Sequence, residues 1–302
     1  MIEILQKKLR DYGATTAAEA ENATKEIIQE IALYALWRAD FFGVALFHGG
    51  TSLRILHGLP RFSEDLDFLL RIPDPEFQWS SYLSALVEIF AQFGLKLDAQ
   101  PMDRMDGAAR EAILKDASIA SRLNLSFVGA RRTTTKIKLE IDTNPPTGSG
   151  EATSFLDFPA DYEVRHQDLA SNFALKIHAL LCHPYLKGRD WFDFSWYVTN
   201  GVYPNLRLLA AALVQTGPWH GQHDLHVDDE WLIAALKPKI ASIDWSVAAA
   251  DVIHFLRPAD AKSLSLWSES FFLAKLGKLA RSGPKSPPLS LPPSICPRLG
   301  AS

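Results

Sequence analysis

A short apolar run, Val44–Phe47, leads directly to two consecutive glycines, Gly49 and Gly50. A run of this length predicts a buried β-strand, and the glycine pair predicts a tight turn at its end. Residues 51–58 then have the pattern of a short helix that stops at a glycine and a proline. This order constrains the fold, because a strand, a tight turn and a helix N-terminus must meet at a single point.

A helix N-terminus that follows glycines is suited to bind phosphate. Glycines let the backbone approach an anion closely, and the first amides of the helix point at it together with the positive end of the helix dipole. We expect Gly49, Gly50, Thr51 and Ser52 to form such a cradle, with Thr51 or Ser52 as the helix cap. A glycine pair before a helix is also common in ordinary turns, so this pattern alone identifies no ligand.

The next strand is expected at residues 65–70 and carries Asp65 and Asp67. Two residues apart on a strand, their carboxylates project to the same face. Mg²⁺ prefers oxygen ligands, and two like charges held this close on an apolar strand are costly without a cation. The pair therefore indicates a Mg²⁺ site, with a charged and solvent-facing strand edge as the alternative.

The whole pattern predicts an α+β protein with a small mixed β-sheet core, an N-terminal helix and a helical C-terminal domain. Beyond the elements above, we expect a helix over 3–40, a helix over 79–93, and strands over 95–99, 123–128 and 135–142. From about residue 165 the pattern is helical, with stretches near 166–182, 189–199, 204–215, 229–237, 244–255 and 262–280.

These elements divide the chain into four parts. They are an N-terminal helical segment (1–40), an α/β core (41–150), a helical C-terminal domain (151–282) and a proline-rich tail (283–302). The tail has no amphipathic period and is therefore expected to be disordered.

The composition is that of a cytoplasmic globular protein. No apolar run is long enough to span a membrane, and the first residues lack the layout of a signal peptide, so we expect no membrane partner. Cys182 and Cys296 are too few for a disulfide framework or a cysteine zinc site. The net charge of −4 argues against a basic coat. A local basic patch is nevertheless enough to bind phosphates, so nucleic acid stays open as a partner.

The strand over 135–142 alternates cleanly between apolar and polar residues. Ile137, Leu139 and Ile141 share one face, and Lys136, Lys138, Glu140 and Asp142 share the other. With Arg131 and Arg132 just before the strand, the lysines offer positive charge to an RNA backbone or a triphosphate. A solvated polar face is the alternative.

Two later helices carry further charged residues. Lys176 lies at the edge of the apolar stripe of the helix near 166–182, where it either snorkels to water or reaches inward to phosphates. Asp190 and Asp193 are three residues apart, on one side of the next helix. The histidine-rich segment 220–226 falls in a predicted loop, and we do not expect it to hold a metal ion.

The order strand, Gly-Gly, helix, Asp-x-Asp strand is that of the nucleotidyltransferase superfamily related to polymerase beta. His48-Gly-Gly-Thr-Ser-Leu-Arg-Ile-Leu56 and Arg61-Phe-Ser-Glu-Asp-Leu-Asp-Phe68 closely resemble the motifs of the AbiEii/AbiGii toxin family. In that family a Gly-Gly-Thr-x-Leu-Arg helix precedes an Arg-Phe-Ser-x-Asp-Leu-Asp-Phe strand. The resemblance covers roughly residues 30–200. His48 departs from it, because the family often has lysine there.

Two further segments extend this resemblance. Lys138-Leu-Glu-Ile141 resembles the Lys-Ile-Glu-Ile strand of the family, and Lys176 followed by Arg189-Asp-Trp-Phe-Asp193 resembles its later motifs. The resemblance therefore implies a nucleotidyltransferase fold and Mg²⁺-dependent transfer of a nucleoside monophosphate from an NTP, with release of pyrophosphate.

The same resemblance implies roles for individual residues. Two Mg²⁺ ions would be held by Asp65, Asp67 and Glu140, with Asp142 as the alternative to Glu140. The nucleotide would be bound by Gly49, Gly50, Thr51, Ser52, Arg61 and Ser63. Lys176 would bind phosphate, and Asp190 would activate the acceptor or support the site. Asp193 is the weaker candidate for the site, since it would brace Arg189.

The resemblance also implies partners. The chain would be the toxin of a toxin–antitoxin pair, with an RNA such as a tRNA 3′ end as acceptor and an antitoxin protein or regulator that controls it. Two alternatives stay open: the same chemistry on a protein or small molecule, and an inert module that binds RNA or a partner protein.

Overall fold

The computed structural model describes residues 2–102, 108–116, 118–119 and 135–283 of the chain. The expected strand over 123–128, Arg131 and Arg132, and residues 284–302 of the expected tail lie outside these described residues.

A seven-stranded mixed sheet forms the centre of the N-terminal part, in the order β3-β4-β5-β2-β1-β7-β6. Its strands are β1 (Ala45–His48), β2 (Leu66–Leu70), β3 (Leu97–Met102), β4 (Ala109–Asp116), β5 (Thr135–Asp142), β6 (Glu151–Leu156) and β7 (Tyr162–Gln167). The central strand β2 runs antiparallel to β1 and parallel to β5, and β1 runs parallel to β7. This arrangement confirms the predicted mixed sheet.

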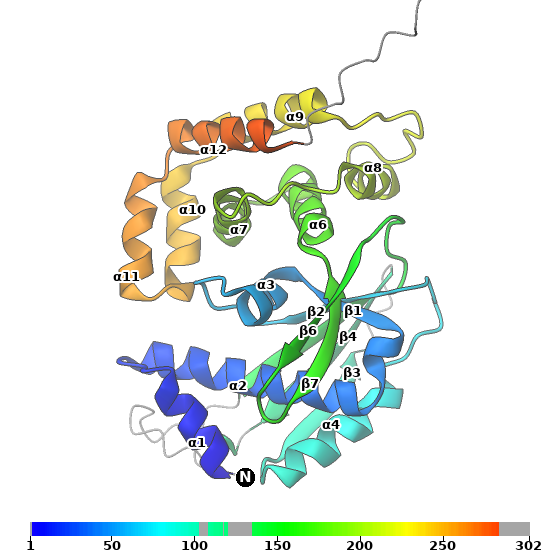
Figure 1. Cartoon of the computed structure of the whole chain (residues 1–302), viewed down its shortest axis with the longest axis vertical. Helices are drawn as coiled ribbons and strands as arrows, with labels where there is room; N and C mark the ends of the chain where they lie inside the picture. Colours follow the sequence, from blue (N-terminus) through cyan, green and yellow to red (C-terminus); the bar gives the residue numbers. More distant parts are fainter. Residues whose placement is uncertain (1, 103–107, 117, 120–134, 284–302) are drawn as a thin grey trace, which may run out of the picture.

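Helices pack on the sheet and continue beyond it (Figure 1). The N-terminal helices α1 (Ile2–Asp11) and α2 (Ala17–Arg38) lie with α4 (Ser80–Gln92) along the sheet, and α3 (Gly49–His57) follows β1. The C-terminal part contains α6 (Leu169–Cys182), α7 (Gly188–Thr199), α8 (Leu206–Gln215), α9 (Asp229–Ala241), α10 (Trp245–Val252), α11 (Pro258–Ala261) and α12 (Glu269–Ser282).

The helix α3 lies between two hydrophobic cores. One core joins the sheet with α2 and α4, and the other joins α6 to α10 with α12. Leu53 of α3 is buried in the second core, whereas Ile55 and Leu56 pack against the first. In Figure 1, α3 accordingly lies between the sheet and helices α6 and α7. Its position is therefore fixed from both sides.

The predicted single helix over 3–40 is wrong, because the chain forms α1 and α2 with a break between them. A capping box begins α2: the Thr16 hydroxyl accepts from the Glu19 amide, and the Glu19 carboxylate accepts from the Thr16 amide. Such reciprocal capping defines a new helix N-terminus.

The predicted boundary at residue 150 falls before the sheet is complete, because β6 and β7 belong to it and the helical part begins at α6. The strand β4 was also not predicted. Its sequence, Ala-Arg-Glu-Ala-Ile-Leu-Lys-Asp, is made of good helix formers, so only its pairing between β3 and β5 decides its structure.

The helices predicted after residue 165 are present, but the last of them are shorter. The stretch 244–255 forms α10 followed by a 3₁₀ turn (Ile253–Phe255). The stretch 262–280 contains a 3₁₀ segment (Lys262–Leu266) before α12, which begins after its N-cap Ser268.

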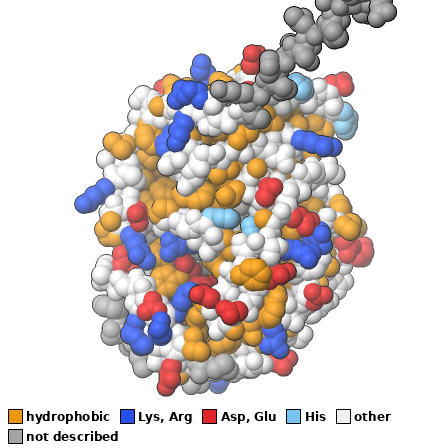
Figure 2. All heavy atoms as spheres, viewed as in Figure 1, with side chains coloured by type: hydrophobic (Ala, Val, Ile, Leu, Met, Phe, Trp, Pro, Cys, Tyr) orange, Lys and Arg blue, Asp and Glu red, His pale blue; other side chains and the backbone are white. Residues whose placement is uncertain are grey.

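Within the described part of the chain, no helix combines the length and the apolar character needed to cross a membrane. On the face shown in Figure 2, basic and acidic side chains are intermingled rather than separated into fields of one sign. This agrees with the small net charge of −4.

Gly188, the first residue of α7, allows a close helix contact that we can test. Its amide donates to Asp251 at 2.8 Å, and a Cβ at this position would clash with the Ala248 carbonyl oxygen of α10. We expect Gly188→Ala to lower the free energy of unfolding by about 1–3 kcal/mol, because α7 and α10 must separate. Urea denaturation measures this change.

The matched control is Gly277→Ala in α12, where the nearest atom, on Arg281, is 3.8 Å from the new Cβ. That change is expected to stabilise the protein by roughly 0.5–1 kcal/mol through helix propensity. Equal effects of the two substitutions would contradict the close contact.

Candidate active site

The helix α3 starts directly at the glycine pair. His48 is its N-cap residue, with an extended backbone and no capping hydrogen bond from its side chain. The expected caps are therefore wrong: Thr51 and Ser52 lie inside the first turn. The Thr51 hydroxyl donates to the Asp65 carbonyl, and the Ser52 hydroxyl donates to the Gly49 carbonyl at 2.9 Å. The helix begins early because β1 ends immediately before it.

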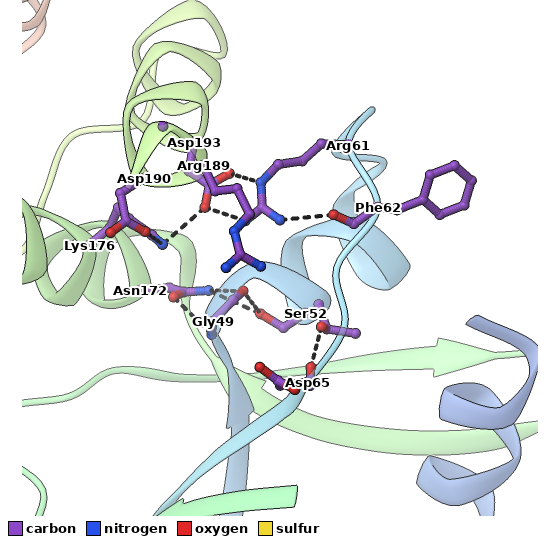
Figure 3. Close-up of polar contacts among 12 residues, drawn as sticks. Gly49, Ser52, Arg61, Phe62, Asp65, Asn172, Lys176, Arg189, Asp190 and Asp193 are labelled. Atoms are coloured by element: carbon purple, nitrogen blue, oxygen red, sulfur yellow. Dashed lines mark hydrogen bonds and ion pairs between the residues drawn. The ribbon is translucent and has the colours of Figure 1, made fainter. Parts of the chain in front are cut away.

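Asn172 of α6 holds the turn from the other side, as Figure 3 shows. Its side-chain oxygen accepts from the Gly49 amide at 3.2 Å, and its amide nitrogen donates to the Ser52 hydroxyl at 3.0 Å. Asn172 was missed by the sequence reasoning. The available signal was its position one helical turn before Lys176, on the same side of the helix.

Gly49 contacts the carboxylate of Asp67 through its backbone. A Cβ on Gly49 would lie 2.5 Å from Asp67 Oδ2, and Gly49 has a φ of 76°, which disfavours any other residue. In the sheet, Asp67 is paired with His48 on β1 and with Glu140 on β5. The predicted phosphate cradle and the predicted metal carboxylate are therefore adjacent.

The carboxylates of Asp65 and Asp67 have no hydrogen-bond or ion-pair partner among the described residues. Burial first, and then the charge of Asp67, raises the pKa of Asp65 to about 6. Burial first, and then the charge of Glu140, raises the pKa of Asp67 to about 6 as well. Burial and a neighbouring carboxylate thus oppose the charged form of each acid, and the positive charge of Lys138 compensates both only in part.

Glu140 lies on the predicted polar face of β5, and the apolar residues of that strand are buried as expected. Its carboxylate, however, pairs with Lys138 at 2.5 Å, and Lys138 also binds Glu111 at 2.7 Å. These two carboxylates outweigh the cost of burial and raise the pKa of Lys138. Asp142 lies on the same face, where its carboxylate accepts from the Asn144 amide.

Asp65 and Asp67 fit Mg²⁺ as a donor set, because they supply unpartnered carboxylate oxygens whose charges repel each other. The third carboxylate is not in place. Over the described residues, no group of three or more His, Cys, Asp or Glu is arranged to hold a metal ion. The side-chain position of Glu140 explains this, since its oxygen is bound to Lys138.

Arg61 and Ser63 lie against Gly50, where a Cβ would clash with the Arg61 guanidinium and lie 3.0 Å from the Ser63 hydroxyl. The Arg61 guanidinium, which was expected to bind the nucleotide, is instead paired with Asp193. It is only 3% exposed and forms two hydrogen bonds of 2.6 Å with Asp193, which is fully buried. The structure therefore places Arg61 beside the cradle as the partner of an aspartate on α7.

Lys176 does not snorkel to water. Its ammonium lies 2.6 Å from Asp190 and 3.0 Å from Asp193, and its side chain is 13% exposed (Figure 3). Burial opposes its charge, but the two aspartates outweigh burial and raise its pKa. Conversely, Lys176 outweighs the burial of Asp190 and lowers the pKa of that acid.

Asp193 does not brace Arg189 as expected. Arg189 lies 3.6 Å from Glu64 and stacks over the ring of Phe255, whereas Asp193 pairs with Arg61 and Lys176.

Burial lowers the pKa of His48 to about 4, so its imidazole is neutral at pH 7.

The chain as a whole is similar to known proteins. The family model described as the nucleotidyl transferase AbiEii toxin of type IV TA systems matches residues 31–271. The solved structures that resemble the chain include a candidate nucleotidyltransferase from H. pylori, with 19% identity, a TM-score of 0.45, and coverage of 84% of this chain and 90% of that one. Another is JHP933 from Helicobacter pylori, with 17% identity, a TM-score of 0.44, and coverage of 86% and 90%. Among curated proteins, none matches.

The raised pKa of Asp67 predicts a pH-dependent effect of Asp67→Asn. The folded-state pKa of about 6 exceeds the ordinary value of 3.8, so the protonated acid stabilises the fold, and this contribution is lost as the pH rises through 6. Without divalent cations, Asp67→Asn should raise the melting temperature at pH 8 and change it little at pH 4. The exposed Asp161→Asn is the control. A gain that is equal at both pH values would contradict the assignment.

The ion pairs of Lys176 predict that Lys176→Met is strongly destabilising. The change leaves Asp190, whose side chain is 11% exposed, without its lysine. Breaking a buried pair in this way costs about 3–5 kcal/mol of unfolding free energy. Urea denaturation of Lys176→Met, Asp190→Asn and the double variant should show that the double variant loses less than the sum. A Met variant as stable as the wild type would contradict the buried ion pairs of Lys176.

Proposed function

The chain belongs to the AbiEii family of nucleotidyltransferase toxins, and from this premise we propose that it transfers a nucleoside monophosphate from an NTP to RNA, such as a tRNA 3′ end. The observation that carries the proposal is the contact between the Gly49 backbone and the Asp67 carboxylate. Through this contact, a helix N-terminus suited to phosphate and a carboxylate pair suited to Mg²⁺ meet at one point.

The triphosphate lies at the start of α3 in this proposal. The first-turn amides of Gly50, Thr51 and Ser52 donate to its oxygens, and the positive end of the helix dipole adds to the attraction. Asn172 keeps this turn in shape, because it is bonded both to Gly49 and to Ser52. The cradle is therefore built before the nucleotide arrives, which lowers the entropic cost of binding.

Asp65 and Asp67 would hold the Mg²⁺ ions in this proposal, and Glu140, which is now paired with Lys138, would be the third ligand. Mg²⁺ bound there would stabilise the charge that develops on the α-phosphate and on the leaving pyrophosphate. The oxygen of the acceptor hydroxyl forms a bond to the α-phosphorus while the bond to pyrophosphate breaks, and the hydroxyl proton passes to water. A pKa of about 6 leaves both aspartates largely ionised at neutral pH, and therefore ready to bind a cation.

Lys176 and Asp190 support this site from α6 and α7. Because Lys176 already neutralises Asp190 and Asp193, it contacts phosphate only by sharing its ammonium with them. Asp190 consequently acts through Lys176 as a positioning residue, which favours site support over activation of the acceptor. Arg61, which Asp193 holds in place, packs against Gly50 and is therefore a positioning residue for that glycine.

As the toxin of a type IV toxin–antitoxin system, the protein would act in the cytoplasm, where NTPs and tRNA are available, and an antitoxin would control it. A direct test incubates the protein with each α-³²P-labelled NTP, Mg²⁺ and a cell lysate that contains total RNA. Label that is removed by ribonuclease supports the proposal. Label on protein or on a small molecule, or no label with any NTP, would refute RNA as acceptor.

We predict that Asp65→Asn or Asp67→Asn lowers the rate of transfer roughly a thousandfold or more, because each removes a charged metal ligand at nearly constant shape. Single-turnover labelling measures the rate, and the melting temperature verifies the fold. Asp161→Asn, on the surface, is the control.

The same assay identifies the third carboxylate. Glu140→Gln should cost far more activity than Asp142→Asn, since Glu140 is paired with Asp67 across β2 and β5. The opposite order would assign the role to Asp142, and wild-type rates for Asp65→Asn or Asp67→Asn would exclude the metal site.

A further inference from the structure

A pocket of ≈ 350 Å³ lies beyond Lys176 and Asp190, where the end of α6, the turn into α7 and the end of α9 meet. Asp190 itself lines the pocket, together with His183, Tyr185 and Lys187. The sequence analysis assigned no role to His183, Tyr185 and Lys187. We call this cavity the His183–Tyr185 pocket.

Its most distinctive feature is an aromatic surface. The rings of His183 and Tyr185 are stacked, with centroids 5.4 Å apart and planes 15° from parallel. Tyr185 is 57% exposed although it is a large aromatic residue, and the ammonium of Lys187 lies 5.2 Å from the centre of its ring. Exposed aromatic rings beside lysines are the usual means by which proteins stack nucleobases.

Polar side chains also line the pocket. Lys239 and Ser242 are among the lining residues, and the Lys239 ammonium donates to the His183 carbonyl at 3.3 Å. His183 Nδ1 is buried and has no hydrogen-bond partner within the described residues, and it lies 3.8 Å from the Asp190 carboxylate. The polar groups that a base edge could reach are therefore those of Lys239 and Ser242.

The pocket is connected to the carboxylate pair. The positive charge of Lys187 lowers the pKa of both Asp67 and Asp190, so Lys187 lies within electrostatic reach of both. Asp190, which lines the pocket, is also bound to the Lys176 ammonium at 2.6 Å.

We propose that the His183–Tyr185 pocket binds the base of the incoming NTP by stacking on Tyr185, an inference that rests on the proposed function. The volume is in the range of small-ligand sites and suits a single base. The end of α6, the turn into α7 and the segment 239–244 line the pocket. A volume at the low end of that range favours a mononucleotide over a polymer.

Calorimetric binding of each of the four NTPs, with Mg²⁺ and without RNA, tests this inference on the full chain. Tyr185→Leu should weaken binding of the NTPs by about 5- to 100-fold, the worth of one base–aromatic stack. Tyr185→Phe keeps the ring and should bind as the wild type does. Phe155→Leu removes another aromatic residue, 78% exposed on β6, and serves as the matched control.

Inorganic triphosphate is the base-free probe in the same experiment. Its affinity should be unchanged by Tyr185→Leu, because it reaches only the start of α3. Equal NTP affinity for the Leu variant and wild type, or equal losses for NTP and triphosphate, would overturn the inference. Loss of binding only for an RNA oligonucleotide would overturn it in favour of the acceptor. A wild-type protein that binds no NTP contradicts the proposed function itself.

Discussion

The buried pair of Arg61 and Asp193 holds the two halves of the protein together at the site. Arg61 follows α3 in the sheet half, and Asp193 belongs to α7 in the helical half. With Lys176 and Asp190, they form a cluster of two positive and two negative side chains that neutralises itself. Burying four charges is costly, and only close geometry offsets the cost. The four charges are therefore paired in only one relative position of the sheet half and the helical half. This position also fixes the geometry of the candidate active site between them.

The neutral cluster contrasts with the carboxylates of Asp65 and Asp67 a short distance away. There, burial and neighbouring carboxylates raise the pKa of each acid, and the nearby lysines offset this only in part. The backbone beside these carboxylates is held in place despite the repulsion, because Asn172 is hydrogen-bonded to Gly49 and Arg61 packs against Gly50. A site destabilised by its own negative charge gains the most from a cation, so the feature that weakens the free protein would strengthen the proposed metal binding.

The sequence predicts well what periodicity and local motifs determine. The strand and glycine turn at 45–50 and the alternation of 135–142 depend on neighbouring residues, and both are found. The partner of Arg61 was not predictable, because Asp193 lies 132 residues away. The edge strand β6 was not predicted for a different reason. Its sequence is not apolar enough to indicate a strand, and its pairing with β7 is what orders it. The missed features thus depend on tertiary contacts and strand pairing, whether distant as for Asp193 or within a hairpin as for β6, and not on the pattern of one segment.

The departure at His48 follows the same logic of charge. A lysine at this position would face Asp67 across the β1–β2 pair and compete with a cation for its carboxylate. The neutral imidazole of His48 leaves that carboxylate free. In the proposed reaction, positive charge for a triphosphate would then come chiefly from the dipole of α3. Lys176 is already bound to two aspartates, whereas Lys187 faces Tyr185 and is within electrostatic reach of Asp67. In the proposed reaction, the neutral His48 therefore leaves the start of α3 as the main contact of the triphosphate, whereas Lys187 lies on the side of the base.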